Sequence, residues 1–145
     1  MAKILIVDCH SAIFAWPELR SLHSKRMILA RDELVKRLTE YQDNTGIHVV
    51  AVFDGKGAKK STETTEPGGI QIFYSGADRT ADDLIERLTA CYATTHEITV
   101  ATSDYLEQQT VISFGAQAVS TDTLKTMIQQ AQDDLQRRLK RHRRT

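Results

Sequence analysis

The sequence lacks the features that define several common classes of protein. It has only two cysteines in 145 residues, too few for a disulfide framework, so we expect Cys9 and Cys91 to be free thiols. No apolar stretch approaches the ~18 residues of a membrane-spanning helix, and the first residues lack the basic flank and long apolar segment of a signal peptide. Neither a Gly-x-Gly-x-x-Gly nor a Walker loop is present. We therefore expect a cytoplasmic protein of one domain that uses no nucleotide cofactor and has no membrane partner.

Charge is balanced overall but unevenly distributed. The chain has 19 Lys and Arg and 19 Asp and Glu. Residues 135–145 hold six of the basic residues and no acid, which leaves 13 basic and 19 acidic residues in 1–134. A basic end on an acidic body suits a polyanion such as RNA, and it is equally compatible with a solvated helix end. We take 1–134 as the folded domain and 135–145 as a basic helix end or tail.

Three short apolar runs each end at an aspartate: Asp8, Asp54 and Asp104. Short runs rich in β-branched residues are typical of strands buried on both faces, and hence of a central parallel sheet. The carboxyl ends of parallel strands meet at one edge, where ligands of open α/β sheets bind. The three aspartates therefore predict one acidic pocket. The runs are residues 4–7, 49–53 and 98–103.

Helices are expected between these strands. Ser24 is expected to cap a helix that ends at Gly46, and Thr121 to cap the last helix. Thr80 with Asp83 resembles a capping box. Further elements are a strand over 70–74, a helix over 105–113, a strand over 117–119, and loops over 9–20 and 55–69. The apolar stripes comprise Ile28, Leu29, Leu34, Val35, Leu38 and Tyr41 in the first helix, Leu84, Ile85, Leu88 and Tyr92 in the second, and Leu124, Met127, Ile128, Ala131, Leu135 and Leu139 in the last.

The acidic residues indicate metal chemistry. Asp82 falls in the first turn of a helix, where the helix dipole favours an ionised carboxylate. Converging carboxylates repel one another unless a cation or shared protons neutralise them. Oxygen ligands suit Mg²⁺ or Mn²⁺, and a pair of such ions can promote phosphodiester cleavage. Some acids, Asp78 and Asp83 among them, are equally explained as helix-start residues.

Other chemistries have less support. Cys9 and His10 are adjacent, and neighbouring side chains at a strand end point apart, which argues against a nucleophilic pair. His10 is either a polar loop residue or a substrate contact, and Trp16 either anchors its loop or stacks on a base. A phosphorylation receiver domain fits Asp8 and Asp54 loosely, but it leaves Asp82 and Asp104 without a role.

Five motifs together resemble the YacP-like branch of the NYN domains, which are relatives of the PIN nucleases. The resemblance covers nearly the whole chain and implies a PIN-like three-layer α/β fold, with a mainly parallel sheet flanked by helices. It also implies a divalent-metal site, endoribonuclease activity and a link to ribosome-associated cleavage of messenger RNA. The motifs are Ile4–Asp8, Ala12–Leu19, Val52–Gly55, Thr80–Glu86 and Ala101–Asp104.

The resemblance also implies roles for particular residues. Asp8, Asp82 and Asp104 correspond to the metal-binding, catalytic acids. The family usually reads Asp-Gly-Tyr-Asn after the first strand, and this chain has Asp8-Cys9-His10-Ser11. Ser11 thus stands in place of an amide and supplies one hydroxyl of shorter reach. Supporting roles fall to Asp54, Thr102 and Ser103.

Our leading hypothesis is therefore a Mg²⁺- or Mn²⁺-dependent endoribonuclease. The alternative is a non-catalytic module that binds RNA or the ribosome through its basic end. Lys59 and Lys60 lie in the loop after Asp54, where they either meet phosphates or are simply solvated. The residues expected to contact RNA phosphates are Lys59, Lys60, Arg137, Arg138, Lys140 and Arg141.

Overall fold

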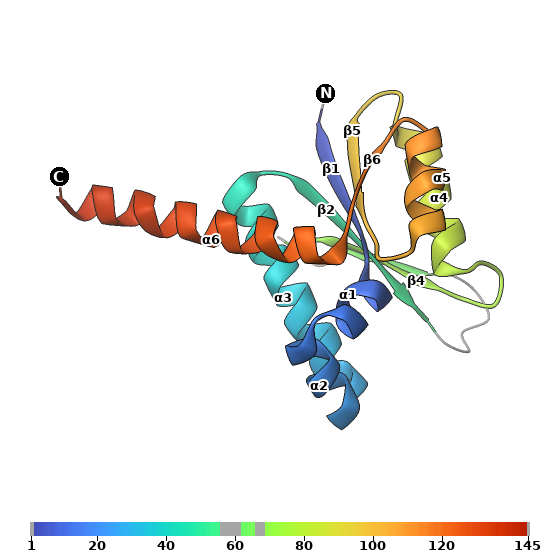
Figure 1. Ribbon diagram of the computed structural model, residues 1–145, viewed down its shortest axis with the longest axis horizontal. Coiled ribbons are helices and arrows are strands. Elements are labelled where there is room, and N and C mark those ends of the chain that lie inside the picture. Colours follow the sequence, from blue (N-terminus) through green and yellow to red (C-terminus); the bar gives the residue numbers. More distant parts are fainter. Residues whose placement is uncertain (1, 56–61, 66–68, 145) are drawn as a thin grey trace.

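A six-stranded sheet with helices on both faces forms the body of the protein (Figure 1). The computed structural model describes residues 2–55, 62–65 and 69–144. The strand order is β3-β4-β2-β1-β5-β6, and all neighbouring strands are parallel except β3 and β4. The elements are β1 (Lys3–Asp8), α1 (Cys9–Ala15), α2 (Pro17–Lys25), α3 (Met27–Thr45), β2 (His48–Asp54), β3 (Thr62–Thr65), β4 (Gln71–Ser75), α4 (Ala81–Tyr92), β5 (Glu97–Ala101), α5 (Tyr105–Ser113), β6 (Gln117–Val119) and α6 (Thr121–Arg144).

β1 lies in the middle of the sheet, as its apolar sequence predicts. Ile6 is in register with Val50 of β2 on one side and with Val100 of β5 on the other. Both neighbours run parallel to β1, so the carboxyl ends of the three central strands meet at one edge. The predicted α/β fold with a mainly parallel sheet is confirmed, and the acids that follow these strands are brought to the same edge.

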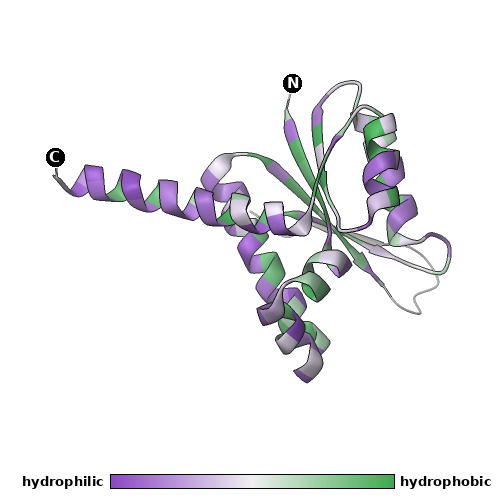
Figure 2. Cartoon of the chain, in the orientation of Figure 1, coloured by the Kyte–Doolittle hydropathy of each residue, from purple (hydrophilic) through white to green (hydrophobic). Residues whose placement is uncertain are grey.

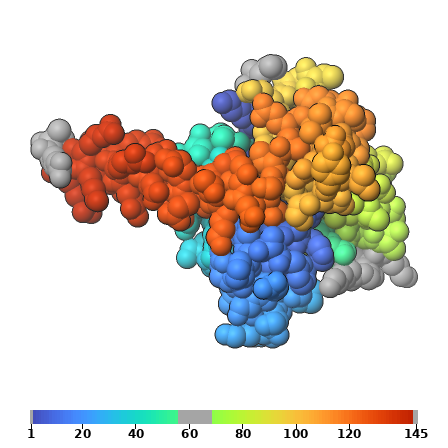
Figure 3. Space-filling view, in the orientation of Figure 1, coloured from blue at the N-terminus to red at the C-terminus, as the bar shows by residue number. Residues whose placement is uncertain are grey.

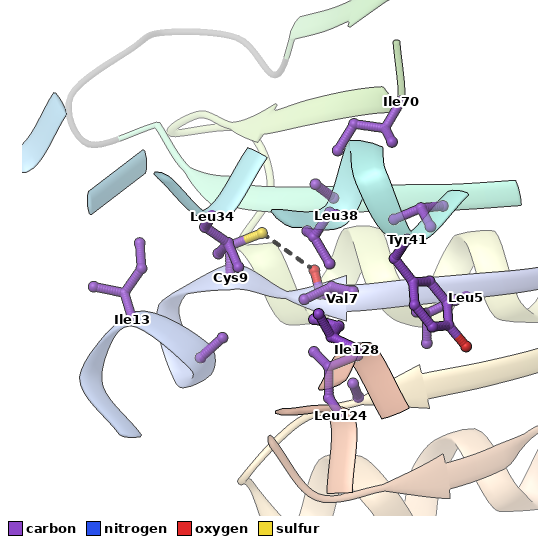
Figure 4. Packing of buried hydrophobic residues seen from close by; sticks show 14 of the residues in the cluster. Leu5, Val7, Cys9, Ile13, Leu34, Leu38, Tyr41, Ile70, Leu124 and Ile128 are labelled. Carbon is purple, nitrogen blue, oxygen red and sulfur yellow. Dashed lines mark hydrogen bonds between the residues drawn. The ribbon is translucent and has the colours of Figure 1, made fainter. Parts of the chain in front are cut away.

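Alternate residues of the central strands face two separate cores. Leu5 and Val7 of β1 pack into the larger core with residues of α1, α3 and α6, and Figure 4 shows part of this packing. Ile6 packs into a smaller core on the opposite face with residues of α4 and α5. This alternation follows from the two-residue period of a strand. The buried Cys9 thiol lies in the larger core and donates to the Val7 carbonyl at 3.7 Å.

The expected loop over residues 9–20 is wrong, because this segment forms α1 and the first four residues of α2. Asp8 caps α1, and the buried Ala12, Trp16 and Leu19 follow a helical spacing that faces the core. Pro17 occupies the first position of α2, which proline favours, and Trp16 before it is extended. Trp16 is buried and donates through Nε1 to the carbonyl of Thr121 at 3.0 Å, so it anchors this segment.

Two predicted helix caps are also wrong. Ser24 lies inside α2, and the next helix begins only after Arg26, which is extended. Ser120 rather than Thr121 caps the last helix, since its hydroxyl accepts from the backbone N–H of Thr123 at 3.0 Å. Thr121 is buried as the first helical residue. By contrast, the caps at Gly46, with φ of 73°, and at Thr80, which accepts from Asp83 N–H, are confirmed.

Some residues of the predicted apolar stripes are exposed, because each stripe extends beyond the part of its helix that packs on the sheet. They are Ile28, Leu29, Tyr92 and Leu139. Within the expected loop over 55–69, residues 62–65 instead pair with β4 as strand β3. Gly55, which follows β2, is required by sterics, since a Cβ atom there would lie 2.0 Å from the carbonyl oxygen of Ser75.

α6 begins on the sheet and extends away from the body (Figure 1). Its first part contributes Leu124, Ile128 and Ala131 to the larger core, and its last turns are strongly hydrophilic (Figure 2). Residues 135–144 thus continue the last helix rather than forming a separate segment. Of the helices in the described part of the chain, none is long and apolar enough to cross a membrane.

Candidate active site

Asp8 is the most firmly held acid at the carboxyl edge of the sheet. It ends β1, is buried, and caps α1 by accepting from the Ser11 N–H at 3.3 Å. Its Oδ2 atom accepts from the hydroxyls of Ser11 at 2.7 Å and Thr102 at 2.9 Å. The helix N-terminus and three donors compensate the loss of hydration that burial imposes on a carboxylate.

A chain of hydroxyl groups connects Asp8 to the segment after β5. Ser103 donates to the Ser11 oxygen at 2.9 Å, and the Asp104 N–H donates to the Thr102 oxygen at 3.2 Å. Residues from two segments more than 90 positions apart are thereby fixed against each other. Ser11 therefore takes part directly in the arrangement of Asp8, and the predicted supporting residues Ser11, Thr102 and Ser103 come together.

Asp104 and Asp82 lie at the starts of two further helices. Asp104 caps α5, and its Oδ1 atom accepts from the N–H groups of Leu106 at 2.9 Å and Glu107 at 3.4 Å. Asp82 lies in the first turn of α4. Both side chains are exposed, unlike that of Asp8. All three acids thus lie near helix N-termini, whose dipoles favour negative charge.

Asp8 and Asp104 are close enough to Asp82 to affect its pKa. The pKa of Asp82 is raised above its ordinary value, first by burial of part of the carboxyl and then by the charges of Asp8 and Asp104. Glu86 and Asp83 add smaller contributions in the same direction. Asp8 and Asp104, two of the three strand-end acids expected to share a pocket, thus lie near Asp82.

Glu107 and Glu86 enlarge this group and were not anticipated from the sequence. Glu107 is only 4% exposed, although it carries a carboxyl group. Burial, the charges of Asp82 and Glu86, and a hydrogen bond shared with Glu86 raise its pKa to about 8. A buried acid with so high a pKa is neutral at pH 7. We call Asp8, Asp82, Glu86, Asp104 and Glu107 the acidic cluster.

The acidic cluster has the donor chemistry of a Mg²⁺ or Mn²⁺ site. Its ligand atoms are all oxygens, which these ions prefer. Glu107 Oε1 is buried without a hydrogen-bond partner, which leaves one oxygen available to a cation or its water. As placed, no three His, Cys, Asp or Glu side chains of the described residues form a group able to hold a metal ion. An ion bound here would therefore keep several water ligands, as Mg²⁺ commonly does.

Asp54 lies apart from the acidic cluster. It ends β2 two residues beyond Val52, which is in register with Asp8, and it is exposed. It accepts from the Ser75 hydroxyl at 3.4 Å and lines a neighbouring pocket with His10 and Arg31. The supporting role predicted for Asp54 therefore concerns a surface beside the cluster.

The predicted phosphate-binding residues lie at the end of α6 or outside the described residues. Lys59 and Lys60 fall outside the described residues. Arg137 pairs with Asp134 at 2.9 Å. The basic end of α6 extends away from the body (Figure 3), so it presents a positive surface separate from the acidic cluster. The exposed basic side chains of this end are Arg137, Arg138, Lys140, Arg141 and Arg143.

The mainly parallel sheet, with acids from two strand ends and from helices α4 and α5 at one edge, defines a PIN-like nuclease domain. A sequence profile described as the YacP-like NYN domain matches residues 5–145. The chain belongs to the YacP-like NYN domain family. The predicted family is thus confirmed, and with it an RNA-related function of the nuclease type.

Related proteins of Bacillus subtilis agree with this assignment. The chain is 33% identical over 139 residues to an uncharacterized protein YacP of strain 168, covering 95% of this chain and 82% of the relative. The crystal structure of Rae1 (YacP) from the same organism matches with a TM-score of 0.78 and 34% identity, covering 96% of this chain and 80% of that one. A point mutant of Rae1 gives a TM-score of 0.80 at 31% identity, covering 96% and 82%. These comparisons offer no support for a receiver domain.

Proposed function

We propose that this protein is a Mg²⁺- or Mn²⁺-dependent endoribonuclease. The observation that carries the proposal is the acidic cluster, in which like charges are held together at the carboxyl edge of the sheet. Such an arrangement destabilises a protein unless a cation or protons neutralise it. Asp8 is held by Ser11 and Thr102, while Asp82 and Glu107 have raised pKa values. A fixed acid beside acids whose pKa values are raised is the electrostatic setting in which cation binding is favourable.

Asp8, Asp82 and Asp104 would hold the ion, in part through its water ligands. The ion would supply positive charge to a phosphodiester and lower the pKa of a bound water. Ser11 and Thr102 orient the Asp8 carboxylate through their hydroxyls. Ser103 is exposed and hydrogen-bonded to Ser11, so its hydroxyl lies at the edge of the cluster, where RNA would approach. Glu107 holds a proton at neutral pH that it can release when positive charge arrives.

The basic end of α6 would contact RNA phosphates. Arg137, Arg138, Lys140 and Arg141 are exposed on a helix that extends from the body, where a long polyanion can reach them without entering the cluster. Lys59 and Lys60 follow Asp54 in the chain and would contribute further phosphate contacts. Cleavage of messenger RNA on the ribosome is the form of this activity that the family resemblance implies. Comparing free with ribosome-bound messenger RNA as substrate tests it.

Calorimetric titration with Mn²⁺ is the primary test, applied to the wild type, Asp8→Asn and Asp104→Asn. We expect one or more ions to bind the wild type and binding to be lost or strongly weakened in both variants. Asp43→Asn, which neutralises an exposed acid of α3, should bind as the wild type does. Wild-type protein that binds no Mn²⁺, with variants as stable as or more stable than the wild type, would contradict the proposal.

The alternative is a non-catalytic module that binds RNA or the ribosome. The observation that favours it is the basic end of α6, which lies apart from the acidic cluster and needs no metal. In that case Asp8→Asn leaves every RNA-dependent property unchanged, whereas deletion of residues 135–145 strongly weakens binding. In a nuclease, Asp8→Asn abolishes cleavage and spares binding.

A further inference from the structure

A pocket of about 280 Å³ lies beside the acidic cluster. It is formed between α1, the C-terminal part of α2, the N-terminal part of α3 and the ends of β2 and β4. His10, two residues after Asp8, contributes to one wall, and Asp54 contributes to another. Asp54 follows the residue level with Asp8 by two positions of β2, about 7 Å along the strand, so the pocket lies at the carboxyl end of the sheet.

Aromatic rings make up much of the lining. Phe14 lies between two histidines, with ring centroids 4.6 Å from His10 and 4.7 Å from His23. On another wall Phe53 and Tyr74 are stacked, with centroids 5.6 Å apart. Phe14 is 39% exposed, so its ring is available to a further planar group. The aromatic residue of this segment that presents its ring to solvent is therefore Phe14, since Trp16 is buried.

A positive charge and hydrogen-bonding groups complete the pocket. The Arg31 guanidinium lies 5.8 Å from the Phe53 ring centroid and 5.7 Å from that of Tyr74, and its Nε donates to the Tyr74 hydroxyl at 2.6 Å. These contacts hold Arg31 in a fixed position in the lining. Asp54 supplies carboxylate oxygens at the same site. The pocket thus combines planar apolar surface, one guanidinium and acceptors for an amino group.

We propose that this pocket binds one nucleobase of single-stranded RNA, adjacent to the phosphodiester presented to the acidic cluster. This inference rests on the proposed function and assigns to it a subsite for substrate recognition. Phe14 stacks on the base, and exposed Met27 and Ile28 cover its edge. The Arg31 guanidinium, which also pairs with exposed Asp32 at 2.8 Å, adds positive charge beside the phosphate that links the base to the cluster. Asp54 accepts from an exocyclic amino group, so the pocket prefers adenine, cytosine or guanine over uracil.

The size and composition of the pocket favour a base over other occupants. A volume of about 280 Å³ is below the ~300–1,000 Å³ of pockets for drug-sized ligands, so it admits one ring system rather than a larger molecule. Stacking on aromatic side chains is the usual means by which proteins hold unpaired bases. An apolar side chain of a second copy would offer no hydrogen-bonding group to Arg31 or Asp54.

The test is an NMR titration of the metal-free, full-length protein with AMP, CMP, GMP and UMP. Ribose 5-phosphate serves as a probe without a base. We expect the mononucleotides to shift the signals of Phe14, Met27 and Ile28 through the ring current of the base, with UMP binding more weakly than the others. Ribose 5-phosphate should leave these signals in place.

Variants at Phe14 identify the ring as the cause. Phe14→Leu should weaken mononucleotide binding about 5-fold or more, the lower end of what base stacking contributes, whereas Phe14→Tyr retains it. Phe114→Ala removes an aromatic side chain of similar exposure, 43%, outside the pocket and should have no effect. Met27→Ala, at an exposed position of the pocket, provides a second variant if Phe14→Leu folds poorly.

The outcomes separate this proposal from the nuclease proposal. Pocket signals that do not respond to any mononucleotide would overturn the base subsite, even if the protein binds Mn²⁺ and cleaves RNA. Signals that move on concentrating the protein alone, without nucleotide, would also overturn it, in favour of a second copy as occupant. Base binding that is lost in Phe14→Leu, in a protein without Mn²⁺ binding or cleavage, would support the pocket and refute the nuclease.

Discussion

The acidic cluster and the basic end of α6 carry opposite charges, and they differ in how firmly their side chains are held by the rest of the protein. In the cluster, Asp8 accepts three hydrogen bonds and caps a helix, and Asp104 caps another. At the end of α6 the basic side chains are exposed, and Arg137 makes an ion pair with Asp134 on the same helix. Charges held in one geometry suit chemistry at a defined atom, whereas solvated charges attract a polyanion without fixing its register.

The largest expected effect comes from neutralising the centre of the cluster. Asp8→Asn should reduce RNA cleavage by more than about 100-fold, because loss of a residue that only orients a metal ligand already costs about 10–100-fold. Affinity for RNA measured in EDTA should stay within about 2-fold, since the charges that attract phosphate are elsewhere. Cleavage rates and fluorescence anisotropy measure the two quantities. Equal decreases in cleavage and affinity would contradict a separation of tasks between the two regions.

Removal of the support around Asp8 should have a smaller effect. Thr102→Ala deletes a hydroxyl that donates to Asp8 at 2.9 Å and accepts from the Asp104 N–H at 3.2 Å. We expect kcat to fall about 10–100-fold with little change in KM, because Thr102 positions the acid without touching RNA. Thr102→Ser retains the hydroxyl and should recover most of the activity. A variant that loses activity through KM instead would show that Thr102 contacts substrate.

Removal of charge from the other region should affect affinity alone. Replacing Arg137, Arg138, Lys140 and Arg141 by alanine should weaken RNA binding about 10-fold or more at physiological salt and leave kcat unchanged. The slope of log affinity against log salt should become less steep by up to about 3. Each phosphate contact that is lost from a single strand lowers the magnitude of this slope by ~0.7. Replacing the three arginines by lysine preserves the charge and serves as the control. An unchanged slope would mean that this end of α6 is simply solvated.

The sequence predicted the frame of this comparison from particular patterns. Short apolar runs ending at Asp8 and Asp104 correctly placed β1 and β5 in a parallel sheet with their acids at one edge, and Thr80 with Asp83 placed the start of α4 and hence Asp82. These predictions succeeded because strand burial and helix capping are local properties of a few adjacent residues. The family resemblance added the supporting roles of Ser11, Thr102 and Ser103, and the structure brings these residues together.

Other features depend on contacts that no local pattern reveals. Residues 9–20 contain bulky apolar residues at helical spacing, but Pro17 interrupts them, and only packing against the sheet shows that two helices meet there. Asp54 ends a strand as Asp8 does, but it lines the neighbouring pocket. The reason is that β2 continues for two residues beyond Val52, which is level with Asp8. Glu107 reads as an ordinary first-turn acid of α5, and its burial appears only when α4 packs beside it. The sequence pattern that could have indicated Glu107 as a member of the acidic cluster is its position three residues after Asp104, in the first turn of the same helix.

Glu107 makes the stability of the metal-free protein depend on pH. Its carboxyl has a pKa of about 8 in the folded protein and an ordinary value of 4.5. Between these values the folded state holds a proton that the unfolded state has released, so stability falls as the pH rises from about 4.5 to 8. The raised pKa of Asp82 acts in the same direction. Glu107→Gln keeps the side chain neutral and should remove much of this fall, raising Tm by a few degrees at pH 8, which corresponds to about 1 kcal/mol.

Thermal unfolding in EDTA between pH 5 and about 8.5 measures this effect, and Glu40→Gln, at an exposed position of α3, is the control. Parallel pH profiles for the wild type and Glu107→Gln would show that Glu107 is ionised in the folded state. In that case the folded protein would hold every carboxylate of the acidic cluster in its ionised form, without a proton shared between them. A steeper profile in the wild type than in both Glu107→Gln and the protein saturated with Mn²⁺ would instead show that protons and cations neutralise the same carboxylates.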